Sequence, residues 1–189
     1  MTPFPIRPQR VVCDLRRALA DDDILISDVG VHKLWLATLF PASRPNTVVL
    51  SNGLASMGIA VPGAVAAKLV RPQCKVVAVT GDGGFLMNSQ ELETAKRLKT
   101  AFVVVVLVDN RYGAIELNQK RRFGRSFGVE FENPDFVQYA ASFGLPGFAV
   151  TSVDDLLPAL RRALNLDQPA IVAALVDPSQ SPAALSTSA

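Results

Sequence analysis

Two acidic side chains follow buried strands that the sequence predicts to be neighbours. Asp82 stands among glycines directly after the apolar run 76–80, and Asp109 follows a second apolar run, 102–108. Runs of this length that are rich in valine are typical of strands buried on both faces of a parallel sheet. Adjacent parallel strands place their carboxyl ends side by side. We therefore expect Asp82 and Asp109 to face one crevice at that edge of the sheet.

Carboxylates beside free backbone amides can bind a hard cation together with the phosphate groups that it bridges. Magnesium usually takes one or two carboxylates, and phosphate oxygens and water complete its octahedral shell. Gly81, Gly83 and Gly84 are expected to turn the chain sharply after the first strand. The amides of Gly83 and Gly84, near a helix predicted over 88–99, could then bind the remaining phosphate charge. The spacing suggests a metal-bridged diphosphate.

The two acidic segments resemble a known cofactor motif. Residues 81–83 (Gly-Asp-Gly), the intervening helix and strand, and residues 109–113 (Asp-Asn-Arg-Tyr-Gly) are similar to the motif of thiamine diphosphate-dependent enzymes. In that family, magnesium is bound by the aspartate after the first glycine, by an asparagine or aspartate at the end of the next strand, and by a main-chain carbonyl two residues later. The triplet alone is weak evidence, but its pairing with residues 109–113 makes the resemblance specific. It implies thiamine diphosphate and Mg2+ as cofactors.

The second metal ligand depends on how this motif is registered. Registration on the tyrosine-glycine pair implies ligation by Asp82, by Asp109 and by the carbonyl of Arg111. The alternative register uses Asn110 and moves the carbonyl to Tyr112. We favour Asp109, because the acetolactate synthase branch often has Asn-Asp here, although this chain has a valine in place of that asparagine. The resemblance further implies cofactor contacts by Gly81, Asp82, Gly83, Gly84, Asn110 and Tyr112.

A second stretch, residues 28–32 (Asp-Val-Gly-Val-His) followed by Trp35, is similar to a segment of acetolactate synthases. The histidine of that segment contacts the cofactor diphosphate, which implies cofactor contacts by Val31 and His32. An uncharged imidazole always keeps one N–H that can donate to a phosphate oxygen. A purely structural histidine is the alternative.

A third stretch, residues 51–63, has glycines at positions 53, 58 and 63 with small residues between them. Such a pattern allows close backbone approach to a ligand, and tight helix packing would explain it equally well. By resemblance, this segment holds the two cofactor rings bent against each other, with Met57 as the apolar wedge and the Ala55 carbonyl accepting from the pyrimidine amino group. Methionine is unbranched and polarizable and suits that role, although an ordinary core methionine is the alternative.

The elements that position these residues alternate along the chain. Strands predicted near residues 24, 48, 76, 102, 148 and 171 alternate with helices, which indicates an α/β fold with three α/β/α layers around a mostly parallel six-stranded sheet. The resembled family has the same fold. We divide the chain into a linker or arm (1–8), a diphosphate-side cofactor domain (9–178) and a flexible tail (179–189).

The composition supports one globular domain and excludes other classes. The chain has 189 residues, of which 49% are hydrophobic and 19% charged, and its net charge of +2 gives no reason to expect nucleic-acid binding. Its apolar stretches are too short to span a membrane. Cys13 and Cys74 lack metal-ligand spacing and are expected to be buried free thiols in a reducing compartment, which favours the cytoplasm.

The resemblance extends over residues 11–177 and is strongest to the catabolic, flavin-independent acetolactate synthases. It implies decarboxylation of pyruvate, a 2-oxo acid, and condensation with a second pyruvate to 2-acetolactate. Ile115 and Gln119 could line the substrate pocket; core packing or a solvated face is the alternative.

The resemblance also implies that the chain is incomplete as a catalyst. The activating glutamate of this family lies on a separate pyrimidine-binding domain. Glu91 and Glu93 belong to the helix after the metal motif and, by the resemblance, are not that residue. We therefore expect no catalytic residue in this chain, a pyrimidine-binding domain of the same or a partner chain, and a homo-oligomer, either a dimer or a tetramer. Two alternatives are the cofactor half of another thiamine-dependent 2-oxo acid decarboxylase, including two-chain types, and a non-catalytic nucleotide-binding module.

Overall fold

One parallel sheet forms the centre of the molecule in the computed structural model, which describes residues 4–177 and 179. Its strands are β1 (Ile24–Ser27), β2 (Val48–Leu50), β3 (Val76–Gly81), β4 (Val103–Val108), β5 (Gly147–Val150) and β6 (Ala170–Leu175). Within the described residues they are ordered β2-β1-β3-β4-β6-β5, and every neighbouring pair is parallel. The predicted six-stranded α/β sheet is confirmed, and β3 and β4 are neighbours as expected.

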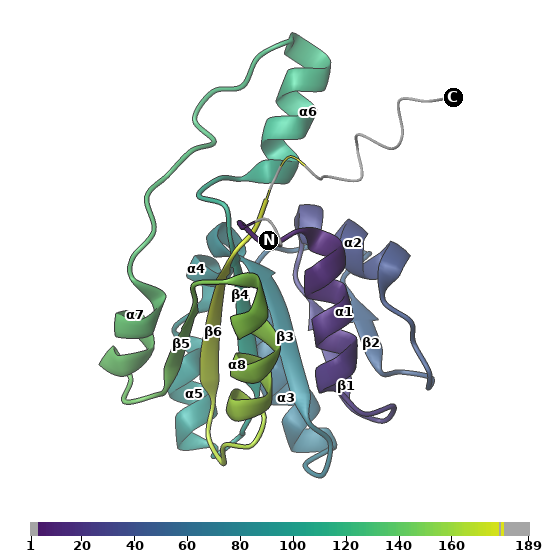
Figure 1. Ribbon diagram of the computed structural model, residues 1–189, viewed down its shortest axis with the longest axis vertical. Coiled ribbons are helices and arrows are strands. Elements are labelled where there is room, and N and C mark those ends of the chain that lie inside the picture. The colour runs from purple at the N-terminus through teal and green to yellow at the C-terminus, as the bar shows by residue number, and fades with distance from the viewer. Residues whose placement is uncertain (1–3, 178, 180–189) are drawn as a thin grey trace.

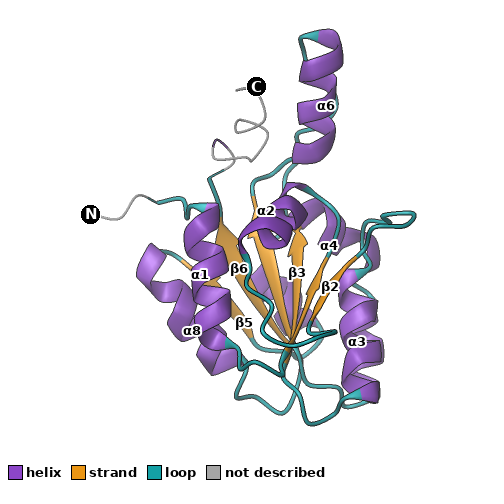
Figure 2. Ribbon diagram, turned by 90° about the vertical axis from the view of Figure 1, so that its right-hand side faces the viewer, coloured by secondary structure: helices purple, strands orange, loops and turns teal. Residues whose placement is uncertain are grey.

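Helices cover both faces of this sheet (Figure 2). They are α1 (Pro8–Ala18), α2 (Val31–Leu39), α3 (Ala60–Val70), α4 (Asp82–Asn88), α5 (Glu91–Arg97), α6 (Gly113–Phe123), α7 (Phe136–Ser142) and α8 (Leu156–Ala163), with a short 3-10 helix at Val153–Asp155. Helices α1, α2 and α8 pack on one face, and α3, α4, α5 and α7 pack on the other. Helix α6 extends away from the body of the domain, beyond the carboxyl ends of the strands (Figure 1).

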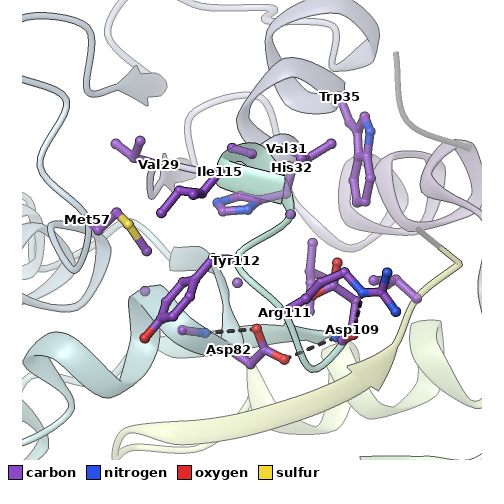
Figure 3. A pocket seen from close by; sticks show the side chains of 18 of the residues that line it. Val29, Val31, His32, Trp35, Met57, Asp82, Asp109, Arg111, Tyr112 and Ile115 are labelled. Atoms are coloured by element: carbon purple, nitrogen blue, oxygen red, sulfur yellow. Dashed lines mark hydrogen bonds between the residues drawn. The ribbon is translucent and has the colours of Figure 1, made fainter. Parts of the chain in front are cut away.

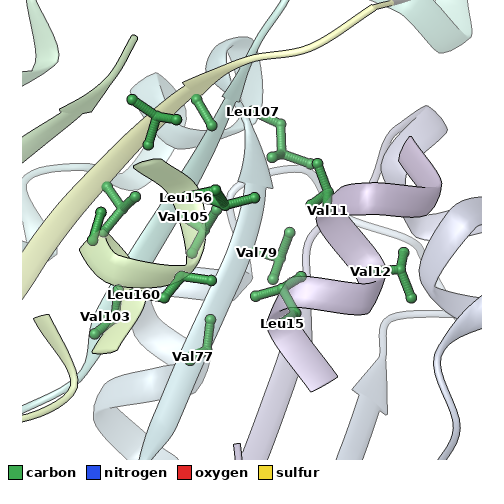
Figure 4. Close-up of a cluster of buried hydrophobic side chains, with 14 of the residues drawn as sticks. Val11, Val12, Leu15, Val77, Val79, Val103, Val105, Leu107, Leu156 and Leu160 are labelled. Atoms are coloured by element: carbon green, nitrogen blue, oxygen red, sulfur yellow. The ribbon is translucent and has the colours of Figure 1, made fainter. Parts of the chain in front are cut away.

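The alternation of side chains along the central strands explains the two-sided core. Val77 and Val79 of β3 pack with Leu15 of α1 on one face (Figure 4). Val76 and Ala78 point to the opposite face, in the other apolar cluster. Burial of one valine side chain stabilises the fold by roughly 1.5–3 kcal/mol. The unbroken apolar runs of the sequence therefore correspond to strands covered on both sides.

The segment after β3 differs from the prediction. A single helix was expected over 88–99 after a sharp glycine turn, but α4 begins at Asp82 itself, and α5 follows as a separate helix. Positive φ angles occur at neither Gly83 nor Gly84. Their role is close approach, because a Cβ on Gly83 would lie 2.5 Å from Cε1 of Tyr112, and one on Gly84 would lie 2.7 Å from Oδ2 of Asp28.

The amino-terminal segment also packs more closely than the expected linker or arm. Ile6 is fully buried, its N–H donates to the carbonyl of Leu175 at 2.9 Å, and it forms an isolated parallel bridge with Val176, just past the end of β6. Pro8 is the first residue of α1. Cys74 is buried as predicted, whereas Cys13 is exposed. The proposed tail lies outside the described residues except for Ser179. None of the described helices has the length and apolar character that a membrane crossing requires.

Candidate functional site

A pocket opens where β1, β3 and β4 end, between the starts of α2, α4 and α6 (Figure 3). The strands are parallel, so their carboxyl ends lie at the same edge of the sheet, and the polar groups that follow them lie there together. The lining includes the predicted site residues Val31, His32, Ala55, Met57, Gly81, Asp82, Gly83, Gly84, Asp109, Arg111, Tyr112 and Ile115. Asn110 and Gln119 are not among the lining residues. Gln119 instead exchanges hydrogen bonds with the backbone of Phe127, which favours the alternative in which it does not line the pocket.

Asp82 joins the ends of β3 and β4 through its carboxylate. Its Oδ1 accepts a hydrogen bond from the Gly83 N–H at 2.8 Å. Its Oδ2 accepts from the N–H groups of Asp109 at 3.1 Å and Asn110 at 2.7 Å, and from Nδ2 of Asn133 at 2.7 Å. Asp82 is buried, and these donors fix the orientation of its carboxylate. The amide of Gly83, which was expected to be free for phosphate, is therefore already engaged by Asp82.

Asp109 lines the same pocket beside Asp82. Burial, and after it the negative charge of Asp82, raises the pKa of its carboxyl to about 7. A cation between the two carboxylates would remove this repulsion. Among the residues that the structure describes, no group of three or more His, Cys, Asp or Glu side chains is placed to hold a metal ion. The pair therefore suits a hard cation that takes its other ligands from carbonyl, phosphate and water oxygens.

Asn110, the competing second ligand, has a different orientation. Its backbone is left-handed, with φ 58°, and its exposed side chain accepts a hydrogen bond from Nδ2 of Asn133 at 2.7 Å. The side-chain amide of Asn110 is thus held by Asn133, whereas Asp109 lines the pocket. This arrangement favours the Asp109 register of the motif.

His32 lies in the first turn of α2 with its ring almost fully buried. Its Nε2 atom has no hydrogen-bond partner, and burial lowers the pKa of the imidazole to about 4. Gly30 permits this placement, because a Cβ there would lie 2.8 Å from Cε1 of His32. An unpartnered polar nitrogen in a pocket is a feature that a bound phosphate oxygen would satisfy.

The buried histidine leads to a prediction for the pH dependence of stability. Because its folded-state pKa of about 4 lies below the ordinary 6.5, unfolding binds a proton between these values, and stability is lost as the pH falls through this window. The shift corresponds to roughly 3 kcal/mol at its full extent. We expect His32→Gln to flatten the pH dependence of the free energy of unfolding between pH 4 and 6.5. Denaturant unfolding of both proteins across that window measures the difference, and superimposable curves would contradict the assignment.

Asp28 is a buried residue whose part in the site was not predicted: it binds the loop that carries Ala55 and Met57 of the pocket lining. Its carboxylate accepts from the N–H of Gly58 at 2.9 Å, from the N–H of Val29 at 2.7 Å and from the Thr80 hydroxyl at 2.8 Å. Burial raises the pKa of Asp28 in spite of these donors. The carboxylate therefore fixes the loop of Ala55 and Gly58, both with positive φ, against the ends of β1 and β3.

Comparison with known proteins identifies the family. Residues 28–174 match the model of the C-terminal thiamine pyrophosphate-binding domain of thiamine pyrophosphate enzymes. The chain belongs to this family. The predicted family and its cofactor, thiamine diphosphate, are therefore confirmed.

Relatives of this domain include acetolactate synthases. The chain is 42% identical over 179 residues to the catabolic acetolactate synthase of Raoultella terrigena, covering 95% of this chain and 32% of that protein. It is 41% identical over 170 residues to an acetolactate synthase of Bacillus subtilis (strain 168), covering 90% of this chain and 30% of that protein. The chain thus spans about a third of the length of the curated relatives it matches.

A solved structure supports the fold. The thiamine diphosphate-dependent 4-hydroxybenzoylformate decarboxylase of Rhodococcus jostii RHA1 superimposes with a TM-score of 0.88 and 24% sequence identity. The match covers 96% of this chain and 34% of the decarboxylase chain. At this level of identity, the likeness establishes the shared fold.

Proposed function

We propose that this domain is the diphosphate-side half of an acetolactate synthase-like enzyme, which decarboxylates pyruvate and condenses it with a second pyruvate to 2-acetolactate. The observation that supports this most strongly is the 42% identity, over 95% of the chain, to a catabolic acetolactate synthase. The paired carboxylates of Asp82 and Asp109 at one pocket agree with a cofactor that is held through its diphosphate.

In this proposal, Asp82, Asp109 and the carbonyl of Arg111 hold a magnesium ion. Oδ1 of Asp82 accepts one hydrogen bond and keeps a lone pair for the cation, whereas three N–H groups occupy Oδ2. Ligation requires both carboxylates to be ionised, and the cation supplies the positive charge that offsets their repulsion. His32 contributes a ring nitrogen to the diphosphate, on the side of the pocket formed by α2.

The apolar part of the pocket is proposed to hold the rings of the cofactor. Met57 lines the pocket and would be the wedge under the bent rings, while the Ala55 carbonyl would accept from the pyrimidine amino group. Ala55 has φ 51°, a strained angle for alanine that the Asp28 anchor helps to impose on this loop. Ile115, at the start of α6, lines the pocket and would face the substrate.

Thiamine diphosphate supplies an electron-accepting thiazolium ring when it is bound, and the protein supplies position and electrostatics. The pocket lining includes no acidic side chain other than those of Asp82 and Asp109 among the described residues. Glu91 and Glu93 belong to α5 and are absent from the lining. We therefore propose that a pyrimidine-binding domain, from the same or a partner chain, brings the activating glutamate, within a cytoplasmic homo-oligomer.

The proposal predicts that the purified chain alone forms no 2-acetolactate from pyruvate, even with thiamine diphosphate and magnesium. Co-expression with the remaining domains of a relative should restore synthesis, because the activating glutamate would then reach the pocket. Product analysis by mass spectrometry separates acetolactate from the aldehyde of a simple decarboxylase. Acetolactate formation by the isolated chain would refute the need for a second domain, and aldehyde as the sole product of the restored enzyme would refute the synthase assignment.

A further inference from the structure

Asn133 makes two side-chain hydrogen bonds at the end of the sheet where the metal site is proposed. Its Nδ2 donates to Oδ2 of Asp82 and to Oδ1 of Asn110, at 2.7 Å in each case. Both hydrogens of the amide are therefore used, one on the end of β3 and one on the end of β4. Asn133 is 51 residues from Asp82 in the sequence and precedes α7.

The backbone around Asn133 supports the same contact. The Tyr112 N–H donates to the Val129 carbonyl at 2.8 Å, and the Phe131 N–H donates to the Asn110 carbonyl at 3.1 Å. The rings of Tyr112 and Phe131 pack with centroids 4.8 Å apart. The segment returning from α6 is thus paired with the turn after β4, and Asn133 adds the single link from this segment to Asp82 in the described hydrogen bonds.

The orientation of the Asn133 amide is set by its two acceptors. A flipped amide would place its oxygen against Oδ2 of Asp82 and Oδ1 of Asn110, which are both acceptors here. In the observed orientation, Oδ1 of Asn133 is buried without a hydrogen-bond partner. An unpaired buried acceptor costs free energy. The two hydrogen bonds that Nδ2 donates must therefore stabilise this orientation by more than the unpaired oxygen destabilises it.

We propose that Asn133 is a positioning residue for the magnesium site. It fixes Oδ2 of Asp82, which leaves Oδ1 available to the cation, and it holds the Asn110 side chain away from the pocket so that Asp109 is the second ligand. The inference rests on the proposed function, because it assumes that Asp82 and Asp109 bind the metal. Asn133 itself makes no contact with the cofactor in this proposal.

The test compares magnesium with calcium in supporting thiamine diphosphate binding to the purified chain. Magnesium demands near-ideal octahedral geometry, whereas calcium accepts irregular shells. Loss of a residue that orients a metal ligand typically lowers affinity by about 10- to 100-fold. We expect Asn133→Ala to weaken magnesium-supported binding by about tenfold and calcium-supported binding clearly less, with Glu132→Gln, a change at the exposed neighbour, as the control.

The ratio of the two affinities makes the result independent of how much of the variant folds, because both metals bind the same folded fraction. Fluorescence of Trp35, the single tryptophan of the chain, reports binding from inside the pocket. Equal weakening with both metals, or unchanged binding, would overturn the positioning role. If the unmodified chain binds no thiamine diphosphate with magnesium, the proposed function itself fails, and the inference fails with it.

Discussion

Replacing Asp82 with asparagine is expected to weaken magnesium-dependent binding of thiamine diphosphate by about 100-fold, or roughly 2.7 kcal/mol. Three N–H donors face Oδ2 of Asp82, so the amide oxygen of the variant must take that position. The NH2 group then points toward the place of the cation, and the site loses both a ligand oxygen and a negative charge. Calorimetric titration with magnesium and thiamine diphosphate measures the loss.

Glu93→Gln is the matched control, because it removes the same charge from an exposed side chain on α5 that is paired with Arg97. The control should bind the cofactor as the unmodified chain does. Near-native affinity in Asp82→Asn, with a native spectrum, would remove Asp82 from the metal site.

The second large effect separates the two registers of the motif. Asp109→Ala is expected to weaken magnesium-dependent binding by about 100-fold, whereas Asn110→Ala should change it by no more than about threefold. The reason is geometric, since Asp109 lines the pocket and the Asn110 side chain accepts from Asn133 outside it. The same calorimetric titration serves for both variants. A strong loss in Asn110→Ala with little change in Asp109→Ala would move the metal ligands one residue along the chain.

The central part of the site could be predicted because strand order is simple to infer. Two valine-rich runs joined by a helical segment predict adjacent parallel strands, and each is followed by an aspartate. The structure brings Asp82 and Asp109 to one pocket for that reason. Asp28 follows a buried strand in the same way, so its position in the sequence carries the same signal for a role at this edge of the sheet.

Other features depended on contacts that periodicity does not encode. Asn133 reaches Asp82 through the path of the segment after α6, which contains no regular element before α7. Gly83 and Gly84 suggested a turn, whereas their function is to let Tyr112 and Asp28 approach the first turn of α4. Gln119 has helical spacing toward the pocket, but its amide is engaged by the backbone of Phe127.

The most direct test of the account is a titration of the unmodified chain with thiamine diphosphate, followed by NMR, in magnesium and then after chelation of the metal. We predict saturable binding at one site in magnesium, with shifts at the Trp35 indole and at the backbone amides of Asp82 and Asp109, and its loss on chelation. Binding of a nucleotide but not of thiamine diphosphate, or thiamine diphosphate binding unaffected by chelation, would contradict a metal-bridged diphosphate site between these two strands.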